Sequence, residues 1–172
     1  MSIEKKDRIK IPAEIKRLKI GAWHFDKNDS AVSTIIGLGS CIGLVLFDPV
    51  NKFGLLSHLM LPKKPTNAYS DTPDLRYIKD AVPFFVDIME KNNAREIIAK
   101  AVGGATLFKE LQMEGRLSVG ERNIIALHES LDSLKIPLVA KDLDKEHGRT
   151  IFFFHNTGHI LIRSYKMGEN YI

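Results

Sequence analysis

Two strand-like runs joined by a short turn constrain the fold of this chain more than any other part of its sequence. The runs cover residues 41–47 and 53–61, and the four residues between them read Asp-Pro-Val-Asn. Aspartate at the first position and proline at the second are typical of a β-turn, so the segment predicts an antiparallel hairpin. Apolar residues occupy consecutive positions in both runs rather than alternate ones. Strands of that kind are covered on both faces, by a second sheet or by helices.

The hairpin also predicts which residues face one another. If residues 48 and 51 close the turn, counting outward places Cys41 directly opposite His58. Directly opposed residues have Cβ atoms about 5 Å apart on one face of a sheet. A thiol and an imidazole at that range form a nucleophile–base pair. A bulge at Gly54 would shift the register by one residue and separate the two side chains.

The remaining segments predict an α+β domain. Further strands are expected at residues 20–25, 31–36, 96–102, 138–143, 150–155 and 159–163. One helix is expected from residue 72 to residue 92, with Pro83 kinking or dividing it. A second is expected after Ser118, which forms an S-x-x-E capping box with Glu121, and it should stop before Pro137. This order of elements indicates a single α+β domain.

The composition is that of a soluble globular protein, with 44% hydrophobic and 27% charged residues in a chain of 172. This length is enough for one domain that buries most of its apolar surface. No apolar run is long enough to cross a bilayer, and the N-terminus lacks the apolar core of a secretory signal. The single cysteine cannot form an intrachain disulfide. We therefore predict a cytoplasmic protein without membrane insertion.

The formal net charge of +4 is concentrated at the N-terminus. Residues 1–19 hold seven basic and three acidic side chains, so the rest of the chain is balanced. A neutral body argues against a nucleic-acid-binding domain, which concentrates Lys and Arg on its folded face. We predict an N-terminal extension over residues 1–18 and one domain over residues 19–172. The extension is interpreted as solvated; contact with an acidic partner or a membrane surface is the alternative.

Cys41 is the main candidate for catalysis, because it follows a Gly-Leu-Gly-Ser turn and faces His58 in the predicted register. Backbone N–H groups around Gly39 and Ser40 would then point at a developing oxyanion. An adjacent imidazolium would lower the pKa of the thiol. The alternatives are that Cys41 is a small buried hydrophobic residue and that His58 is a core histidine. The pair carries more weight than either residue alone.

A third group is needed to orient the imidazole or to support the substrate. Thr34 and Ser33, in the preceding predicted strand, are the nearest candidates in the sequence, although both residue types are common in strands.

No metal site and no phosphate loop are predicted. His155 and His159 flank a hairpin loop, but no cysteine or carboxylate cluster accompanies them at ligand spacing. A solvated surface pair is the preferred interpretation of these histidines. Gly103-Gly104 lacks the Gly-Lys-Ser/Thr ending of a phosphate-binding loop.

Several motifs resemble those of CheD, the family of bacterial chemoreceptor glutamine deamidases. The most specific block runs from GLGSC at residues 37–41, through Asp48-Pro49, to SHLMLP at residues 57–62. Later motifs resemble the family in the same order: GGA at 103–105 with Phe108, GERN at 120–123, Gly148-Arg149 and Thr157-Gly158. The resemblance extends over residues 18–164.

The resemblance implies an α/β sandwich of mixed and antiparallel sheets with two or three helices, similar to the catalytic domain of cytotoxic necrotizing toxins. It also implies a Cys-His-Thr triad, with Cys41 as nucleophile and His58 as general base. The position of the family threonine is Ile35 in this chain, and Thr34, one residue earlier, is the candidate third member. A second departure is the DKEH sequence at residues 144–147, where the family tends to have paired glycines.

By the same resemblance, the expected reaction is hydrolysis of the side-chain amides of specific glutamines on methyl-accepting chemotaxis receptors. Glutamyl methyl esters are expected as further substrates, and neither a metal nor an organic cofactor is needed. The first alternative is a regulatory partner of a CheC-type chemotaxis phosphatase with little or no catalysis. A thiol hydrolase acting on small amides is the second.

Overall fold

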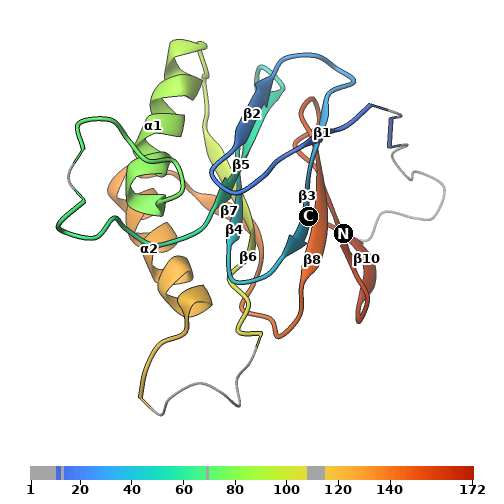
Figure 1. Cartoon of the computed structure of the whole chain (residues 1–172). Coiled ribbons are helices and arrows are strands. Elements are labelled where there is room, and N and C mark those ends of the chain that lie inside the picture. The colour runs from blue at the N-terminus through green and yellow to red at the C-terminus, as the bar shows by residue number, and fades with distance from the viewer. Residues whose placement is uncertain (1–10, 13, 69, 108–114) are drawn as a thin grey trace.

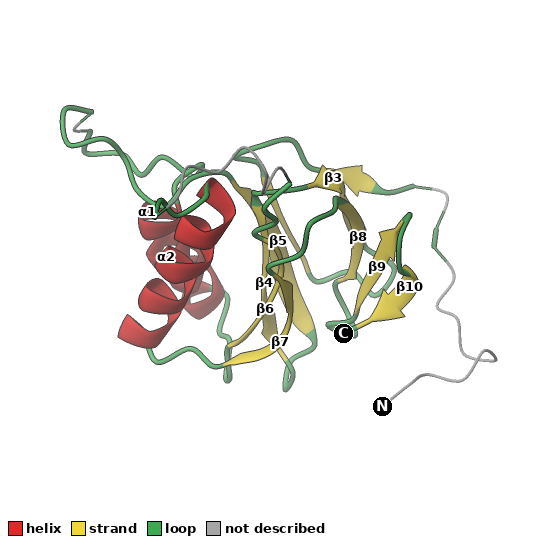
Figure 2. Cartoon of the chain, turned by 90° about the horizontal axis from the view of Figure 1, so that it is seen from below, coloured by secondary structure: helices red, strands yellow, loops and turns green. Residues whose placement is uncertain are grey.

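The computed structural model describes residues 11–12, 14–68, 70–107 and 115–172, and its elements form three layers. Two helices make up one outer layer, a five-stranded sheet lies in the middle, and a second five-stranded sheet forms the other outer layer (Figure 1; Figure 2). This arrangement confirms the predicted α+β sandwich. It also covers the central hairpin on both faces, as its apolar sequence predicts.

The middle sheet contains the hairpin at its centre. Its strand order is β2-β5-β4-β6-β7. The strands are β2 (Trp23–Asp26), β4 (Ile42–Asp48), β5 (Phe53–Leu59), β6 (Ile98–Gly103) and β7 (Leu138–Leu143). Neighbours are antiparallel except β6 and β7, which are parallel.

The outer sheet has the order β1-β3-β8-β9-β10. Its strands are β1 (Lys16–Arg17), β3 (Val32–Leu38), β8 (Arg149–Phe154), β9 (Ile160–Ser164) and β10 (Gly168–Tyr171). The two short edge strands, β1 and β10, were not predicted from the sequence. Because β1 pairs with β3 and the following Leu18 is buried, the ordered sheet begins inside the segment predicted as an extension. Most of that segment lies outside the described residues.

Both helices pack on the middle sheet. α1 (Ile78–Lys91) is a single helix, so the prediction that Pro83 divides it is wrong. Pro83 lies in the second turn, is exposed, and removes only one intrahelical donor. The predicted start near residue 72 is also wrong, because residues 72–77 belong to the preceding loop. α2 (Val119–Ser133) has the predicted capping box, with reciprocal hydrogen bonds of 2.7 and 3.1 Å between Ser118 and Glu121.

Alternation along the central strands assigns each of their faces to one core. Ile42, Leu44 and Leu46 pack toward the helices, whereas Val45 and Phe47 pack toward the outer sheet. The same alternation in β5 directs even-numbered residues toward the outer sheet. The layer between the two sheets therefore receives side chains from both central strands.

The predicted register of the hairpin is wrong. Asp48 pairs with Phe53, so the loop contains four residues rather than two, and Lys52 adopts a left-handed φ of 55°. The amide of Lys52 donates to the carbonyl of Asp48, and the Asp48 carboxylate accepts from the amides of Val50 and Asn51. These bonds stabilise the longer loop. The pairing moves by two positions, which changes the partner of each residue but keeps its face.

Candidate functional site

The turn that carries Cys41 connects the two sheets. β3 ends at Leu38 in the outer sheet, and β4 begins at Ile42 in the middle sheet (Figure 1). Gly37 has a φ of 71°, which favours glycine, and a Cβ at Gly39 would lie only 2.9 Å from Cδ1 of Leu107. Gly37 is therefore favoured by its backbone conformation, whereas Gly39 lies in close contact with the Leu107 side chain. Cys41 is half-buried at the edge of the core between the sheets.

His58 lies on the same face of the middle sheet, near the end of β5. Its direct cross-strand partner is Gly43, not Cys41. Cys41 comes two residues before Gly43, which makes it the diagonal neighbour of His58. Diagonal neighbours in an antiparallel pair are about 7 Å apart, still within reach of long and aromatic side chains. The register therefore makes the two predicted residues diagonal neighbours rather than directly opposed.

Burial keeps both candidate groups neutral. Desolvation raises the pKa of the Cys41 thiol above its ordinary value of 9.0, although the amide of Cys41 itself favours the thiolate. Desolvation lowers the pKa of His58 below 6.5. Nδ1 of His58 is buried and has no hydrogen-bond partner among the described residues. At neutral pH the two groups are therefore a thiol and a neutral imidazole, and an imidazole in that state has a lone pair to accept a proton.

The backbone of Leu18 acts on the imidazole of His58, and sequence reasoning missed this contact. A hydrogen bond to the Leu18 backbone raises the pKa of His58 against the effect of burial, and only the carbonyl can favour the imidazolium in this way. Leu18 is fixed in turn, because its amide donates to the carbonyl of Thr34 over 2.9 Å. No local sequence signal identifies this role, since any residue supplies a carbonyl.

Thr34 lies on the opposite face of β3 from the site. Ile35 belongs to the core between the sheets, so strand alternation directs Thr34 toward the outside of the outer sheet, on the side of Val32. The Thr34 hydroxyl donates to the carbonyl of Ile151 over 2.7 Å. The structure therefore separates its hydroxyl from Cys41 and His58, and places Ile35 on the face where the family threonine is expected.

Three carbonyls of the Gly39-Ser40-Cys41 turn are held by distant donors. The carbonyl of Gly39 accepts from the amide of Ala105 over 3.0 Å, and that of Cys41 accepts from the amide of Gly104 over 2.9 Å. The carbonyl of Ser40 accepts from the side chain of Asn123 over 2.8 Å. Gly104 requires glycine here, with a φ of 64° and Ile124 within 2.6 Å of any added Cβ. The turn is thus fixed by the segment after β6 and by α2.

An open groove lies on the helical side of the middle sheet, where the chain leaves β5. It has a volume of about 610 Å³ and lies between the segment after β5, which begins with Leu61 and Pro62, and the first turns of α2. Ile125 and Leu117 are exposed in it. The charged residues that line the groove are Lys63, Lys64, Lys79, Arg122 and Glu129. The groove therefore combines an apolar floor with a mainly basic rim.

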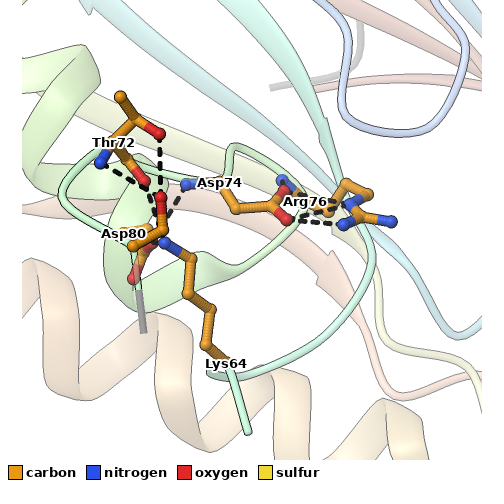
Figure 3. A network of polar contacts seen from close by, with 6 residues as sticks. Lys64, Thr72, Asp74, Arg76 and Asp80 are labelled. Atoms are coloured by element: carbon orange, nitrogen blue, oxygen red, sulfur yellow. Dashed lines mark hydrogen bonds and ion pairs between the residues drawn. The ribbon is translucent and has the colours of Figure 1, made fainter. Parts of the chain in front are cut away.

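The loop between β5 and α1 borders this groove and is held by a polar network (Figure 3). Nζ of Lys64 lies 2.7 Å from the Asp80 carboxylate and donates to the carbonyl of Thr72 over 3.0 Å. Asp80 also accepts from the amide of Asp74. The Asp74 carboxylate binds the Arg76 guanidinium, which lowers the pKa of Asp74 to about 2. This network links both ends of the loop to the start of α1.

The histidines of the terminal hairpin do not form a solvated pair, so that interpretation is wrong for His155. His155 is fully buried, with Nε2 2.8 Å from the Ser33 hydroxyl and Nδ1 2.9 Å from the carbonyl of Gly54. Burial lowers its pKa to about 4. The Ser33 hydroxyl also contacts Nδ1 of His24 at 2.7 Å, so Ser33 joins two histidines rather than the candidate pair. Within the described ranges, no three His, Cys, Asp or Glu side chains are grouped to hold a metal ion.

Comparison with known proteins identifies the family. Residues 60–164 match the family model described as CheD chemotactic sensory transduction. The chain belongs to the CheD family. A relative from Caldanaerobacter subterraneus subsp. tengcongensis, named probable chemoreceptor glutamine deamidase CheD, is 37% identical over 163 residues, which cover 92% of this chain and 99% of the relative. Proteins with the same name from Archaeoglobus fulgidus and Clostridium botulinum are 36% and 37% identical, over 89% and 92% of this chain and 96% and 99% of their own lengths.

The family assignment confirms the resemblance seen in the sequence. The family model begins at residue 60, after both Cys41 and His58. The alignments with CheD relatives are longer, and one that covers 92% of the chain includes the segment between these two residues. No helix in the described part of the chain has the length and apolar character needed to cross a membrane.

Proposed function

We propose that this protein hydrolyses the side-chain amides of specific glutamines on chemoreceptors, with Cys41 as nucleophile and His58 as base. The CheD relatives are named for this substrate and reaction. The observation that carries the proposed mechanism is the position of Cys41 and His58 on one face of the central hairpin. Cys41 follows directly on a turn whose carbonyls are held by other segments.

The first half of the reaction forms a thioester. The neutral imidazole of His58 takes the proton of the Cys41 thiol as the sulfur attacks the carboxamide carbon. The carbonyl oxygen becomes an oxyanion, which accepts hydrogen bonds from the amides of Ser40 and Cys41. The imidazolium then gives its proton to the departing nitrogen, and ammonia leaves. The Leu18 carbonyl stabilises the imidazolium during this step.

The second half releases glutamate. His58 removes a proton from water, the hydroxide attacks the thioester carbon, and the Cys41 sulfur leaves and regains a proton. The same sequence accepts a glutamyl methyl ester, with methanol leaving instead of ammonia. The reaction as proposed uses side chains and backbone groups of this chain and water. Thr34 is assigned no proton transfer, because its hydroxyl donates to Ile151.

The open groove that follows β5 supports contact with a macromolecular substrate rather than with a small amide. A small amide is bound in an enclosed pocket that covers most of its surface, whereas this groove is open and has exposed Ile125 and Leu117. Lys64 and Lys79 are paired with Asp80 and Glu129, so the rim offers Lys63 and Arg122 to a substrate segment with acidic residues near the glutamine.

The test is incubation of the protein with receptor cytoplasmic fragments, followed by intact-protein mass spectrometry and measurement of released ammonia. We expect deamidation by the wild-type chain, and none by Cys41→Ala or His58→Gln. His128→Gln is the matched control, because His128 lies on α2 and lines a different pocket. A brief reaction quenched in acid should also trap the acyl group on Cys41.

Two results would overturn the proposal. Deamidation that persists in Cys41→Ala would exclude the cysteine mechanism. A null result with wild type and variant alike, combined with retained binding to a CheC-type phosphatase, would support the regulatory role instead.

A further inference from the structure

The carboxamide of Asn123 joins the two segments that carry the candidate pair. Its Nδ2 donates to the carbonyl of Ser40 over 2.8 Å and to the carbonyl of Met60 over 2.9 Å. Ser40 directly precedes Cys41, and Met60 comes two residues after His58. Asn123 itself is fully buried on α2, a different layer of the fold (Figure 2). One side chain thus bridges the nucleophile turn and the strand of the base.

The bond to Ser40 decides which way the amide of Cys41 points. Within one trans peptide unit the C=O and the following N–H point in opposite directions. Because Asn123 holds the Ser40 carbonyl toward α2, the N–H of Cys41 is directed away from α2. That N–H acts on the Cys41 sulfur itself, where it favours the thiolate. It is therefore on the side where an oxyanion would form during attack by that sulfur.

The adjacent peptide is oriented in the same manner. The Gly39 carbonyl accepts from Ala105, so the N–H of Ser40 is directed away from that residue. Among the described residues no group accepts a hydrogen bond from the Ser40 amide. The amides of Ser40 and Cys41 are thus each oriented by a hydrogen bond to the carbonyl of the same peptide unit. Of these two units, only Ser40–Cys41 is held by a side chain.

We propose that Asn123 is a positioning residue that orients the Ser40–Cys41 peptide as an oxyanion donor and holds it in register with the strand of His58. This inference rests on the proposed function and names a part of its machinery. Asn123 acts through the backbone and touches no substrate.

The local sequence places Asn123 with little freedom. The Ser118–Glu121 capping box fixes the first turn of α2, and Gly120 lets that turn approach the segment after β6. A Cβ at Gly120 would lie 2.4 Å from the carbonyl oxygen of Gly104 and 2.6 Å from that of Ala105. The helix start therefore sits against the same residues that hold the Gly39 and Cys41 carbonyls. An amide side chain is required at position 123, because a carboxylate or an alkyl group cannot donate to two carbonyls.

The experiment compares Asn123→Asp with wild type in two reactions of Cys41. Amide hydrolysis passes through an oxyanion, whereas alkylation by iodoacetamide does not. We expect glutamine hydrolysis by Asn123→Asp to fall by roughly 10²-fold in kcat, the cost of losing an oxyanion donor. On the high-pH plateau, where Cys41 is fully ionised in both proteins, the alkylation rate should stay within about twofold of wild type. Ser130→Ala is the matched control, because it removes another buried hydrogen bond of α2, to Ala126, away from the turn.

Three results would overturn the inference. The first is a folded Asn123→Asp variant that hydrolyses glutamine as fast as wild type. The second is a variant in which hydrolysis and alkylation fall by the same factor. The third is a Ser130→Ala variant that loses as much hydrolysis as Asn123→Asp. If Asn123→Asp does not fold, Asn123→Ala, which keeps the helix but removes both donors, is measured instead. Amide proton shifts of Ser40 and Cys41, recorded by NMR, report on the peptide orientation without any substrate. If Asn123→Asp changes the shifts of these two amides but the wild-type protein hydrolyses no glutamine, the proposed function is rejected and the positioning role is kept.

Discussion

Gly43 is the direct cross-strand partner of His58, so the residue opposite the candidate base has no side chain. The outer sheet fills that space, because an added Cβ at Gly43 would lie 2.7 Å from Cδ1 of Ile151 and 3.2 Å from Cδ2 of Leu38. The two sheets are therefore in close contact at Gly43. Cys41 and His58 lie on either side of this contact as diagonal neighbours.

Gly43→Ala should destabilise the fold and reduce activity. The added methyl group pushes the sheets apart, and overpacking of a core costs about 1–3 kcal/mol. Urea unfolding at neutral pH measures the change in the free energy of unfolding. Gly148→Ala is the control, since the nearest atom to its added Cβ is 3.9 Å away. Equal stability of the two variants would contradict the close sheet contact, and Ile151→Val should partly rescue Gly43→Ala.

The pH dependence of Cys41 alkylation should show that Cys41 and His58 are both uncharged in the resting protein. Burial raises the pKa of Cys41 above 9.0, so its alkylation by iodoacetamide should increase with pH and reach half its maximum above pH 9.0. Cys41 is the only cysteine, so the signal is specific, and urea-denatured protein serves as the reference with a lower midpoint. A midpoint below pH 7 in the folded protein would mean a resting thiolate–imidazolium pair instead.

The fall in activity at acid pH should reflect the protonation of His58. The base must be neutral to accept a proton, and burial lowers the pKa of His58 below 6.5. We therefore expect the acid limb of kcat/KM to have its midpoint below pH 6.5. The profile is measured with the receptor fragment between pH 4.5 and 8. An acid limb centred above pH 6.5 would contradict the dominant effect of burial.

Stability should decrease as pH falls from 6.5 to 4 because of His155. Its pKa is about 4 in the folded protein and 6.5 when unfolded, so the unfolded chain binds one more proton in this window. The loss amounts to roughly 3 kcal/mol, from about 1.4 kcal/mol per pKa unit. Urea unfolding at several pH values measures the slope. His155→Gln should flatten it, and an unchanged slope would show that His155 is not held neutral.

Asp80→Ala should loosen the loop between β5 and α1. The change removes the ion pair with Lys64 and the acceptor of the Asp74 amide, at a cost of about 1 kcal/mol (Figure 3). Faster trypsin cleavage after Lys63 is the expected readout, because Pro65 blocks cleavage after Lys64. Asp87→Ala is the control, because it removes an exposed ion pair with Lys91 on the same helix. Equal cleavage of the two variants would argue against the network.

The sequence by itself determined most of the elements and the face on which Cys41 and His58 lie. Consecutive apolar residues predicted a hairpin covered on both sides, and the Ser118–Glu121 box predicted the start of α2, because both signals are local. The predicted face of Cys41 and His58 is correct although the predicted register is wrong. The pairing moved by two positions, and a shift by two keeps each side chain on the same face. The helix start near residue 72 failed because the loop is held by long-range contacts of Lys64 and Asp80 that no local pattern encodes.

Only the tertiary structure decided which groups support the candidate pair. The hairpin partner of His58 depends on whether the loop has two or four residues, and that is set by hydrogen bonds of Asp48, including one from the amide of Arg95 in another segment. Thr34 is next to Ile35 in sequence but on the opposite face of its strand. Leu18 and Asn123 act through hydrogen bonds with backbone groups far away in the chain, and such contacts arise from the packing of layers rather than from any motif.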